Sequence, residues 1–470
     1  MADAIVAHAI ERETPTVVST PCEKKMEFSV REIGEVIGAA STSEARITGW
    51  STDTRSIVPG DLYFALRGPN FDGNAFVGEA LERGAVAAVA ENQGPRVLQV
   101  PNALAALQEI AAWARQNWAR KVVGVTGSAG KTSTKDIIAA MLGVTMPVGK
   151  TIGNLNNHVG VPLSILRLPG DSQVAVLELA MNHAGEIRDL CAIAKPDVGV
   201  VTNVGHAHIE AFSSIEGIAA AKRELIESLP ADGVAVLNAD DPLVSQFGRV
   251  HPGRSVTFGL SGAADVRAVN MQLTGEGLRF EVDGAQFESV LTGRHNLLNL
   301  LAGIAVAGVF GIRPRELTAV VKGFTPGKMR GERFSHDGIE ILNDCYNSNP
   351  DAARAMIDAL RDTPAKRRVA VLGEMLELGR WAEPLHREVG EYVARSGIDV
   401  LVGIRGEARH LVDAAKEAGQ AVDAAFFFPE AAEAGDWLRK IARPGDVILF
   451  KGSRGTHVER ALERLVESLN

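Results

Sequence analysis

One segment near residue 125 constrains the fold of this chain more than any other. Residues 122–125 form a short apolar run that predicts a buried strand, a glycine-rich turn follows, and residues 132–142 predict a helix. A strand, a glycine turn and a helix in this order hold nucleotide phosphates, because the backbone N–H groups of the turn and of the helix N-terminus converge. The segment therefore predicts a phosphate-binding turn inside an α/β domain.

The residues of this turn have the chemistry that a nucleoside triphosphate requires. Gly127 and Gly130 let backbone N–H groups approach phosphate oxygens without a Cβ in the way. Lys131 can neutralise the β- and γ-phosphates, and the Thr132 hydroxyl can bind Mg²⁺. The general pattern has its first glycine at position 125, where this chain has valine. A tight turn that carries a lysine by chance is the alternative.

Length and composition limit the class of protein. A chain of 470 residues exceeds one ordinary core and suggests about three domains. The formal net charge of -9 disfavours nucleic acid as a partner. Cys22, Cys191 and Cys345 lack metal-ligand spacing and indicate free thiols in a reducing compartment. With neither a signal-peptide pattern nor an apolar run long enough to span a membrane, we expect a cytoplasmic protein.

The order of predicted elements divides the chain into four parts. Residues 1–25 are acidic and weakly periodic and predict a mobile N-terminal tail. Residues 26–101 predict a small α/β domain. Residues 102–325 have continuous apolar strands separated by helices, which favours a mainly parallel sheet covered on both faces, with an antiparallel flap at 265–291. Residues 326–470 predict a third α/β domain, of doubly wound type.

Polar residues follow several predicted strands of the central domain, at the edge where open α/β sheets bind ligands. Glu178 ends one strand, His206 follows the next, and Lys222 lies on the helix after it. Mg²⁺ prefers oxygen, so Glu178 is the stronger candidate ligand, and a hydrogen-bonded structural histidine is the alternative for His206. Asp240 and Asp241 predict a helix cap rather than a ligand set.

Other polar segments are candidate binding sites, each with a plainer alternative. Residues 53–55 and Arg67 can hold an anionic ligand or form a solvated turn. Residues 293–299 begin a helix whose two asparagines share one face, which suits a base edge or a helix cap. Residues 343–350 and 451–455 end strands, and the lysine, serine and arginine of the latter suit a carboxylate-bearing ligand or a solvated loop.

In combination, these residues resemble the Mur ligases, the ATP-dependent amide-bond-forming enzymes of peptidoglycan precursor synthesis. The resemblance covers residues 28–470, and residues 124–132 are similar to the family's phosphate loop, shifted glycine included. The family's order continues with Glu178, His206, Lys222, residues 295–299, Arg330 and Asp344. Five further segments resemble the branch of the family that adds D-alanyl-D-alanine: residues 151–162, 181–187, 346–350, 372–379 and 451–454. Asn74 and Ala180 depart from it, since relatives often have histidine and glycine there.

The resemblance implies a three-domain Mur ligase architecture of the α/β class, with a central P-loop-type, mainly parallel sheet and a Rossmann-like C-terminal domain. It implies that ATP, with Mg²⁺, phosphorylates the terminal carboxylate of UDP-N-acetylmuramoyl-tripeptide. The amine of D-alanyl-D-alanine then attacks this acyl phosphate and gives the pentapeptide precursor of peptidoglycan. We expect a cytoplasmic monomer. A sister ligase for another amino acid or for folate, a P-loop kinase and a nucleotide-gated binding module are the alternatives.

The resemblance also assigns residues to this chemistry. It implies phosphate contacts from Gly127, Ser128, Ala129, Gly130, Lys131, Thr132 and Ser133, and adenosine contacts from Asn296, Asn299, Arg330, Asp344, Tyr346 and Asn347. It implies that Lys131, Glu178, His206 and Lys222 are catalytic, and that Mg²⁺ is held by Thr132, Glu178, His206 and a carbamylated Lys222. A helix-surface lysine paired with Glu224 or Glu227 is the alternative for Lys222. The implied substrate contacts are Asp53, Thr54, Arg55, Arg67, Asn74, Asn156 and Asn157, with Lys451, Ser453 and Arg454 for D-alanyl-D-alanine.

Overall fold

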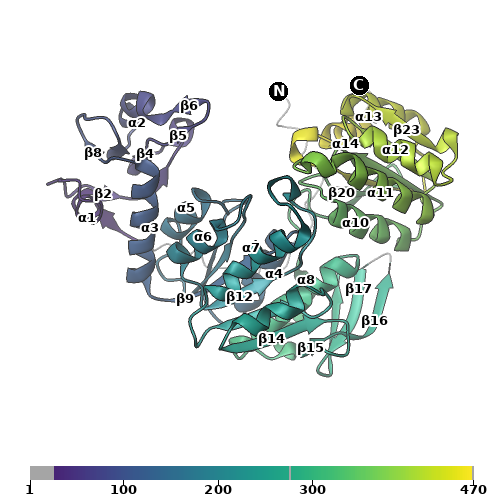
Figure 1. Cartoon of the computed structure of the whole chain (residues 1–470), viewed down its shortest axis with the longest axis horizontal. Coiled ribbons are helices and arrows are strands. Elements are labelled where there is room, and N and C mark those ends of the chain that lie inside the picture. Colours follow the sequence, from purple (N-terminus) through teal and green to yellow (C-terminus); the bar gives the residue numbers. More distant parts are fainter. Residues whose placement is uncertain (1–25, 275–276, 468–470) are drawn as a thin grey trace.

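The computed structural model describes residues 26–274 and 277–467, so the tail expected at residues 1–25 lies outside the described residues. Figure 1 shows three α/β units that follow one another along the chain, from purple through teal to yellow. Each unit is built around its own main sheet. The α/β class and the three-unit organisation expected from the sequence are confirmed, whereas the domain boundaries stay predictions.

The N-terminal unit has a four-stranded parallel sheet in the order β3-β4-β7-β8. Its strands are β3 (Gly49–Ser51), β4 (Asp61–Phe64), β7 (Ala87–Ala90) and β8 (Val97–Gln99). Around them lie β1 (Phe28–Ser29), α1 (Val30–Val36), β2 (Arg46–Ile47), η1 (Thr54–Ser56), β5 (Arg67–Gly68), β6 (Phe71–Asp72), η2 (Gly73–Phe76) and α2 (Val77–Glu82). Helix α3 (Ala103–Trp118) begins where the Asn102 side chain accepts the Ala105 N–H, and packs against both this unit and the next.

The central unit is built on a seven-stranded sheet in which every neighbouring pair is parallel, in the order β10-β11-β9-β12-β13-β14-β15. Its strands are β9 (Lys121–Thr126), β10 (Val148–Lys150), β11 (Val174–Glu178), β12 (Val198–Val201), β13 (Val234–Asn238), β14 (Arg254–Gly259) and β15 (Val266–Arg267). The covering elements are α4 (Lys131–Leu142), α5 (Gly160–Leu166), α6 (Glu186–Ala194), η3 (Ile209–Ala211), α7 (Ile215–Glu227), η4 (Val244–Val250), α8 (Arg294–Val309), η5 (Pro314–Glu316) and α9 (Thr318–Gly323).

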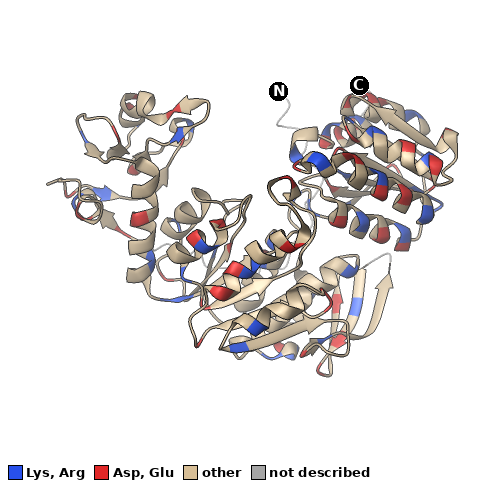
Figure 2. Ribbon diagram, in the orientation of Figure 1, with Lys and Arg blue, Asp and Glu red and all other residues tan. Residues whose placement is uncertain are grey.

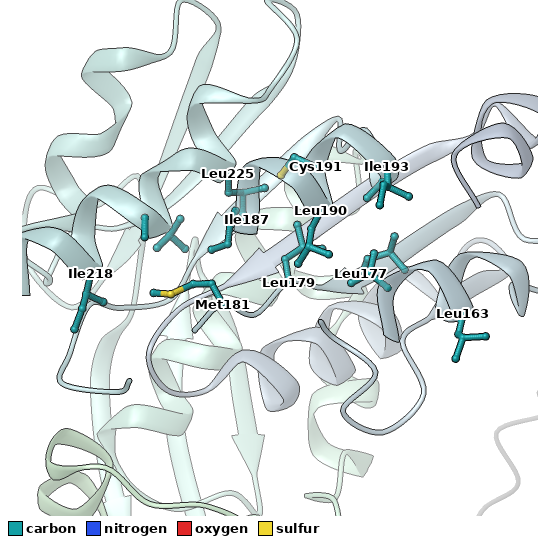
Figure 3. Close-up of a cluster of buried hydrophobic side chains, with 14 of the residues drawn as sticks. Leu163, Leu177, Leu179, Met181, Ile187, Leu190, Cys191, Ile193, Ile218 and Leu225 are labelled. Carbon is teal, nitrogen blue, oxygen red and sulfur yellow. The ribbon is translucent and has the colours of Figure 1, made fainter. Parts of the chain in front are cut away.

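Alternate residues of the central strands enter two different cores. Leu177 and Leu179 of the β11 segment pack with the apolar side chains of α5, α6 and α7, as Figure 3 shows. Val174 and Val176 point to the opposite face and pack with α4 and α8. Because both faces are covered, the strands are apolar throughout, as expected for a parallel sheet.

The antiparallel region predicted near residue 270 is confirmed as a sheet of its own, in the order β16-β17-β18. Its strands are β16 (Val269–Thr274), β17 (Gly277–Val282) and β18 (Ala285–Ser289). Phe280 and Phe287 stack across it with their ring centroids 5.0 Å apart and join the core on the α8 face. The preceding β15 instead extends the parallel central sheet.

The C-terminal unit has a six-stranded sheet in the order β19-β20-β24-β21-β22-β23, parallel except for β19. Its strands are β19 (Glu332–His336), β20 (Ile339–Asp344), β21 (Arg367–Gly373), β22 (Val400–Ile404), β23 (Ala425–Phe428) and β24 (Asp446–Lys451). Its helices are α10 (Pro350–Asp362), η6 (Gly379–Trp381), α11 (Ala382–Arg395), α12 (Ala408–Glu417), η7 (Val422–Ala424), α13 (Ala431–Ile441), η8 (Arg454–Thr456) and α14 (Glu459–Val466). The sequence did not predict β19, because this polar edge strand lacks an apolar run.

Charged residues lie mainly on the outer elements. Figure 2 shows Lys and Arg interspersed with Asp and Glu on the C-terminal helices, whereas the central strands are largely uncharged. Within residues 26–274 and 277–467, no helix combines the length and the apolar character needed to cross a membrane.

Candidate active site

A cavity of about 520 Å³ lies between the central and C-terminal units. The phosphate loop, the loop before α5 and the ends of β11 and β12 line it from the central unit, and residues 330–356 line it from the C-terminal unit. The predicted site residues that line it are Ser128, Ala129, Gly130, Lys131, Thr132, Ser133, Asn156, Asn157, Glu178, Asn296, Asn299, Arg330, Asp344, Tyr346, Asn347 and Lys451. Residues far apart in the chain are thus brought together at the carboxyl ends of two parallel sheets.

The phosphate loop has a conformation that only glycine permits at two positions. Gly127 has φ 151° and Gly130 has φ 78°. A Cβ at Gly127 would lie 1.8 Å from the Thr202 hydroxyl oxygen, so the chain passes too close to the neighbouring strand for a side chain. Gly130 is the N-cap of helix α4, and among the described residues no side chain caps this helix, so its first N–H groups can bind an anion.

The end of the neighbouring strand β12 holds this loop in place. The Asn203 side chain accepts the Ala129 N–H at 2.8 Å, and the Asn203 carbonyl accepts the Ser128 N–H at 3.0 Å. The Thr202 hydroxyl donates to the Ala129 carbonyl at 2.7 Å. The sequence did not assign these two residues to the loop, although their position at a strand end was a usable signal.

Lys131 has the surroundings of a cation that binds an anionic ligand. Its ammonium donates to the Gly127 carbonyl at 2.9 Å, and among the described residues it has no carboxylate in ion-pair range. Burial lowers the pKa of Lys131, while the more distant Glu178 opposes this effect. A bound phosphate would supply the missing counter-charge.

Thr132 and Glu178 form a pair of oxygen donors at the base of the loop. The Thr132 hydroxyl donates to one Glu178 carboxylate oxygen at 2.8 Å, and the Asn156 amide donates to the other at 2.8 Å. Glu178 is 1% exposed. A hydroxyl and a carboxylate fit Mg²⁺, which completes its shell with water and substrate phosphates. In the described part of the chain, no cluster of three or more His, Cys, Asp or Glu residues could bind a metal by itself.

Two residues that the sequence did not assign support Glu178 from behind. The Thr151 hydroxyl accepts the Glu178 backbone N–H at 3.0 Å. The Thr151 carbonyl accepts from the Lys135 ammonium at 2.9 Å, and Lys135 is only 2% exposed. Lys135 is therefore a buried cation next to the proposed metal site rather than a solvated helix residue.

Lys222 is buried, so the helix-surface alternative for it is wrong. Its side chain is 2% exposed, and within the described residues its ammonium has neither a hydrogen bond nor an ion pair. Glu224 instead accepts the Gly185 N–H, and Glu227 pairs with Arg223. Burial, followed by repulsion from Lys131, places the pKa of Lys222 far below its ordinary value.

The two histidines after β12 occupy different places. His206 lies outside the residues that line the cavity, and both its backbone N–H and its Nδ1 contact the Asp351 carboxylate of the C-terminal unit, at 2.7 and 3.0 Å. Asp351 raises the pKa of His206. His208 does line the cavity, and its Nδ1 contacts the Glu377 carboxylate. The sequence selected His206 and missed His208, because spacing alone does not reveal which side chain faces inward.

A second group of side chains that line the cavity contact one another. The Arg330 guanidinium stacks 3.7 Å from the centroid of the Tyr346 ring. Asn299 donates to Asn296 at 3.3 Å, and its own oxygen accepts from the Thr134 hydroxyl at 3.1 Å. The Lys451 ammonium donates to Asp344 at 2.6 Å and to the Asn347 carbonyl at 3.0 Å. A flat cationic stack and buried amides suit a purine nucleoside.

The remaining predicted residues lie outside the cavity lining. Ser453 is buried and donates to the Ser348 carbonyl at 3.3 Å, while Arg454 is exposed beside Glu459. In the N-terminal unit, Arg55 pairs with Asp53 and holds the pKa of that carboxyl at about 2. Arg67 pairs with Glu91 at 3.0 Å. Asn74 is buried and accepts the Glu91 N–H, while Thr54 is buried in η1.

Asp240 and Asp241 both have structural roles, but only Asp241 has the capping role that the sequence predicted. One Asp241 oxygen accepts the N–H groups of Leu243 and Val244, which caps the turn into η4. Asp240 accepts the N–H groups of Leu260 and Ser261. Neither carboxylate is among the cavity-lining residues.

Comparison with known proteins agrees with this architecture. Three family profiles match successive parts of the chain: the Mur ligase family catalytic domain at residues 46–122, the Mur ligase middle domain at 125–307, and the Mur ligase glutamate ligase domain at 329–454. The chain belongs to the Mur ligase family. Its described units and the cavity between the last two are therefore those of a Mur ligase.

Several relatives of this Mur ligase are named for one and the same activity. UDP-N-acetylmuramoyl-tripeptide–D-alanyl-D-alanine ligase of Bacillus subtilis is 34% identical over 94% of this chain and 98% of its own length. The ligase of that name from Synechocystis is 38% identical over 90% and 93%. The crystal structure of MurF from Acinetobacter baumannii has a TM-score of 0.87 at 27% identity and covers 94% of this chain and 99% of that one. MurF ligase from Thermotoga maritima in complex with ADP has a TM-score of 0.79 at 31% identity, over 89% and 96%.

Proposed function

We propose that this Mur ligase joins D-alanyl-D-alanine to UDP-N-acetylmuramoyl-tripeptide at the expense of ATP. The observation that carries the proposal is near-full-length similarity, at 34% and 38% identity, to two ligases named for that reaction. The cavity supports it, because a phosphate loop from the central unit and residues of the C-terminal unit line the same cavity. The product would be the pentapeptide precursor of peptidoglycan, made for the cell wall.

The proposed reaction has two steps. The peptide carboxylate oxygen attacks the γ-phosphorus of ATP, the bond to the β-phosphate oxygen breaks, and ADP leaves. The neutral amine of D-alanyl-D-alanine then attacks the acyl carbon, and inorganic phosphate leaves from the tetrahedral intermediate. Activation is required because a carboxylate has no adequate leaving group.

The chain's own residues position these groups. The N–H groups at the start of α4 bind the phosphates, and Lys131 neutralises the phosphoryl group that is transferred. Thr132 and Glu178 would hold Mg²⁺, which supplies charge neutralisation during phosphoryl transfer. Asn296, Asn299, Arg330, Asp344, Tyr346 and Asn347 would surround the adenosine. Closure of the C-terminal unit over the cavity would exclude water from the acyl phosphate.

For the metal-binding histidine we propose a different residue from the one that the sequence indicated. His206 and Lys222 were the sequence candidates, and neither lines the cavity. His208 does, so we propose it as the histidine nearest the reacting phosphates. Lys222 is suited to carbamylation, because that reaction requires a neutral amine and burial disfavours its ammonium.

The remaining substrate contacts, within the cavity and outside it, are also proposals. Asp53, Thr54, Arg55, Arg67 and Asn74 would bind the UDP moiety, with Asn156 and Asn157 nearer the reacting carboxylate. Lys451, Ser453 and Arg454 would bind D-alanyl-D-alanine. We place the enzyme in the cytoplasm, where these nucleotide substrates are made, and expect a monomer.

The test is phosphate release by the purified chain with MgATP and UDP-N-acetylmuramoyl-tripeptide, with and without D-alanyl-D-alanine. We expect release that depends on the dipeptide, and a product heavier than the tripeptide by one dipeptide less water. Single amino acids and folate serve as alternative substrates. Turnover with a single amino acid or with folate but not with D-alanyl-D-alanine would refute the proposal. A stable phosphorylated product formed without any amine would refute it as well.

A further inference from the structure

The loop from Thr202 to Ser213 connects the phosphate loop to the C-terminal unit. On one side, the Ser128 hydroxyl donates to the Gly205 carbonyl at 2.9 Å and accepts the Gly205 N–H at 2.8 Å. On the other side, the Glu210 N–H donates to the Glu377 carbonyl at 3.3 Å, and Arg380 donates to the Ser213 carbonyl at 3.3 Å. The loop is therefore held from both sides.

His208 and Glu377 face each other across this contact. The His208 Nδ1 lies 2.5 Å from a Glu377 carboxylate oxygen, and this hydrogen bond is the largest of the effects that lower the pKa of Glu377. His208 lines the cavity, whereas Glu377 does not. The pair therefore joins a cavity side chain of the central unit to a carboxylate supplied by the C-terminal unit.

The backbone of both residues is unusual. His208 has φ 60° and Glu377 has φ 63°, in the left-handed region that residues other than glycine rarely adopt. Such conformations persist where the surrounding contacts require them. At Gly379, which has φ 51°, a Cβ would lie 2.8 Å from the Glu210 Cβ, so the two segments also approach closely. The tertiary contact, rather than local preference, sets the position of this pair.

The chemistry of the pair fixes the state of the imidazole ring. A carboxylate only accepts hydrogen bonds, so the Nδ1 of a neutral His208 must carry the proton and Nε2 must carry the lone pair. Histidines that bind metals usually have their other ring nitrogen held in this way by a carboxylate or carbonyl. His206 and Asp351 form a similar pair two residues earlier, but that ring is outside the cavity lining.

We infer that Glu377 is the positioning residue of His208. It holds Nδ1–H, so that the Nε2 lone pair of His208 is presented to the cavity only when the C-terminal unit is docked. The inference deepens the proposed function, and the expected effect of Glu377 on turnover rests on that function. The expected effect of Glu377 on the tautomer of His208 does not.

The structural test uses the full chain with ¹⁵N-labelled histidine, at a pH where the ring is neutral, with a His208→Gln variant to assign the signal. In the wild type we expect the Nδ1–H tautomer. In Glu377→Gln we expect a mixture of tautomers, because an amide can donate as well as accept. Glu383→Gln is the matched control, since Glu383 approaches His410 within the same unit and outside the cavity. An Nε2–H tautomer in the wild type, or no change in Glu377→Gln, would overturn the inference.

The second test measures Mn²⁺ binding by electron paramagnetic resonance and turnover with MgATP. We expect Glu377→Gln to weaken metal binding with ADP present, and to lower kcat, by about 10–100-fold, without a comparable rise in the KM for the tripeptide. Equal metal binding in Glu377→Gln and wild type would overturn the inference. Glu377→Asp, which keeps an acceptor, should recover part of the loss, and its thermal melt shows whether the chain is folded. If the wild type ligates no dipeptide but the tautomer and Mn²⁺ arms hold, the proposed function fails and the inference stands.

Discussion

The N-terminal and C-terminal units meet the central unit in different ways. Helix α3 joins the N-terminal unit to the central unit. Its buried Leu107 and Ile110 belong to a core that also contains Trp50 and Leu62 of the N-terminal unit. The contact between the central and C-terminal units contains the polar contacts of His206, His208 and Ser213, and it lies against the cavity.

The difference indicates which unit can move during a catalytic cycle. Exposing buried apolar surface costs about 25 cal/mol per Å², whereas hydrogen bonds at a surface are exchanged with water at a net cost of about 0.5–1.5 kcal/mol each. The polar contacts of the C-terminal unit can therefore break at a smaller cost than the apolar contacts of α3, while buried residues of the C-terminal unit such as Met356 and Leu378 also join the large core. The cavity lies at these polar contacts, and breaking them would suit substrate entry and product release.

The largest effect should come from the cavity itself. Lys131→Ala should lower ligation by about 10³-fold, because the transferred phosphoryl group loses a preorganised cation. The midpoint of thermal unfolding should stay the same or rise, because this half-buried ammonium loses part of its hydration and has no carboxylate in ion-pair range among the described residues. Lys121→Ala is the control, since Lys121 pairs with Asp197 away from the cavity. Wild-type turnover in Lys131→Ala would contradict the assignment.

The next effect tests the apolar contact. Leu107→Ala should lower the free energy of unfolding by about 2–5 kcal/mol, because the side chain is fully buried and leaves a cavity. Denaturant unfolding measures this, with the exposed Val422→Ala as control. The Leu107→Ala variant should still bind ADP at denaturant concentrations below its unfolding transition. A loss of ADP binding under native conditions would show that the N-terminal unit is needed to build the nucleotide site.

A smaller effect tests the support of Glu178. Thr151→Val removes the acceptor of the buried Glu178 N–H, which should cost about 1–3 kcal/mol of stability. The Mg²⁺ concentration for half-maximal turnover should also rise, because the carboxylate is less well positioned. Thr151→Ser keeps the hydroxyl and should behave like the wild type in both measurements. Equal Mg²⁺ dependence in all three proteins would separate Thr151 from the metal site.

The smallest effect concerns pH and the polar contact. The pKa of His206 is raised above 6.5 and that of Asp351 is lowered below 3.8. The contribution of His206 to the stability of the docked state is complete below the unfolded pKa of histidine, and it is lost as the pH rises through the folded pKa. The aspartate contribution is complete above its unfolded pKa and is lost as pH falls through the folded value. Docking by this pair should therefore be strongest between about pH 4 and 6.5.

Small-angle X-ray scattering of the ligand-free chain measures this docking. We expect the radius of gyration to increase slightly as the pH rises from 6 to 9, and the increase to be smaller in Asp351→Asn. Glu391→Gln, which removes the carboxylate of the exposed Arg395–Glu391 pair on α11, is the control. The same response in wild type and Asp351→Asn would exclude this pair as its cause.

The parts of the site that could be predicted have signals within one short segment. The glycines of the phosphate loop, the Lys131-Thr132 pair and the carboxylate at the end of β11 each follow from local spacing. Parallel strands place their carboxyl ends at one edge, so the meeting of Thr132 and Glu178 was predictable once the strands were recognised.

The parts that could not be predicted depend on contacts between distant segments. Lys135 and Lys222 look like ordinary helix residues in the sequence, and only packing of the helices on the sheet buries them. The choice between His206 and His208 depends on a left-handed residue and on a carboxylate 169 positions away, at Glu377.

By itself, the sequence determined the three-unit architecture and the nucleotide chemistry, because these depend on periodicity and on residues that are neighbours along the chain. The family followed from the resemblance of motifs along the whole chain to the Mur ligases. Only the tertiary structure decided which histidine faces the cavity, which lysines lose their water, and how the C-terminal unit completes the site. Those outcomes depend on the burial and the mutual orientation of whole units, and no local pattern records them.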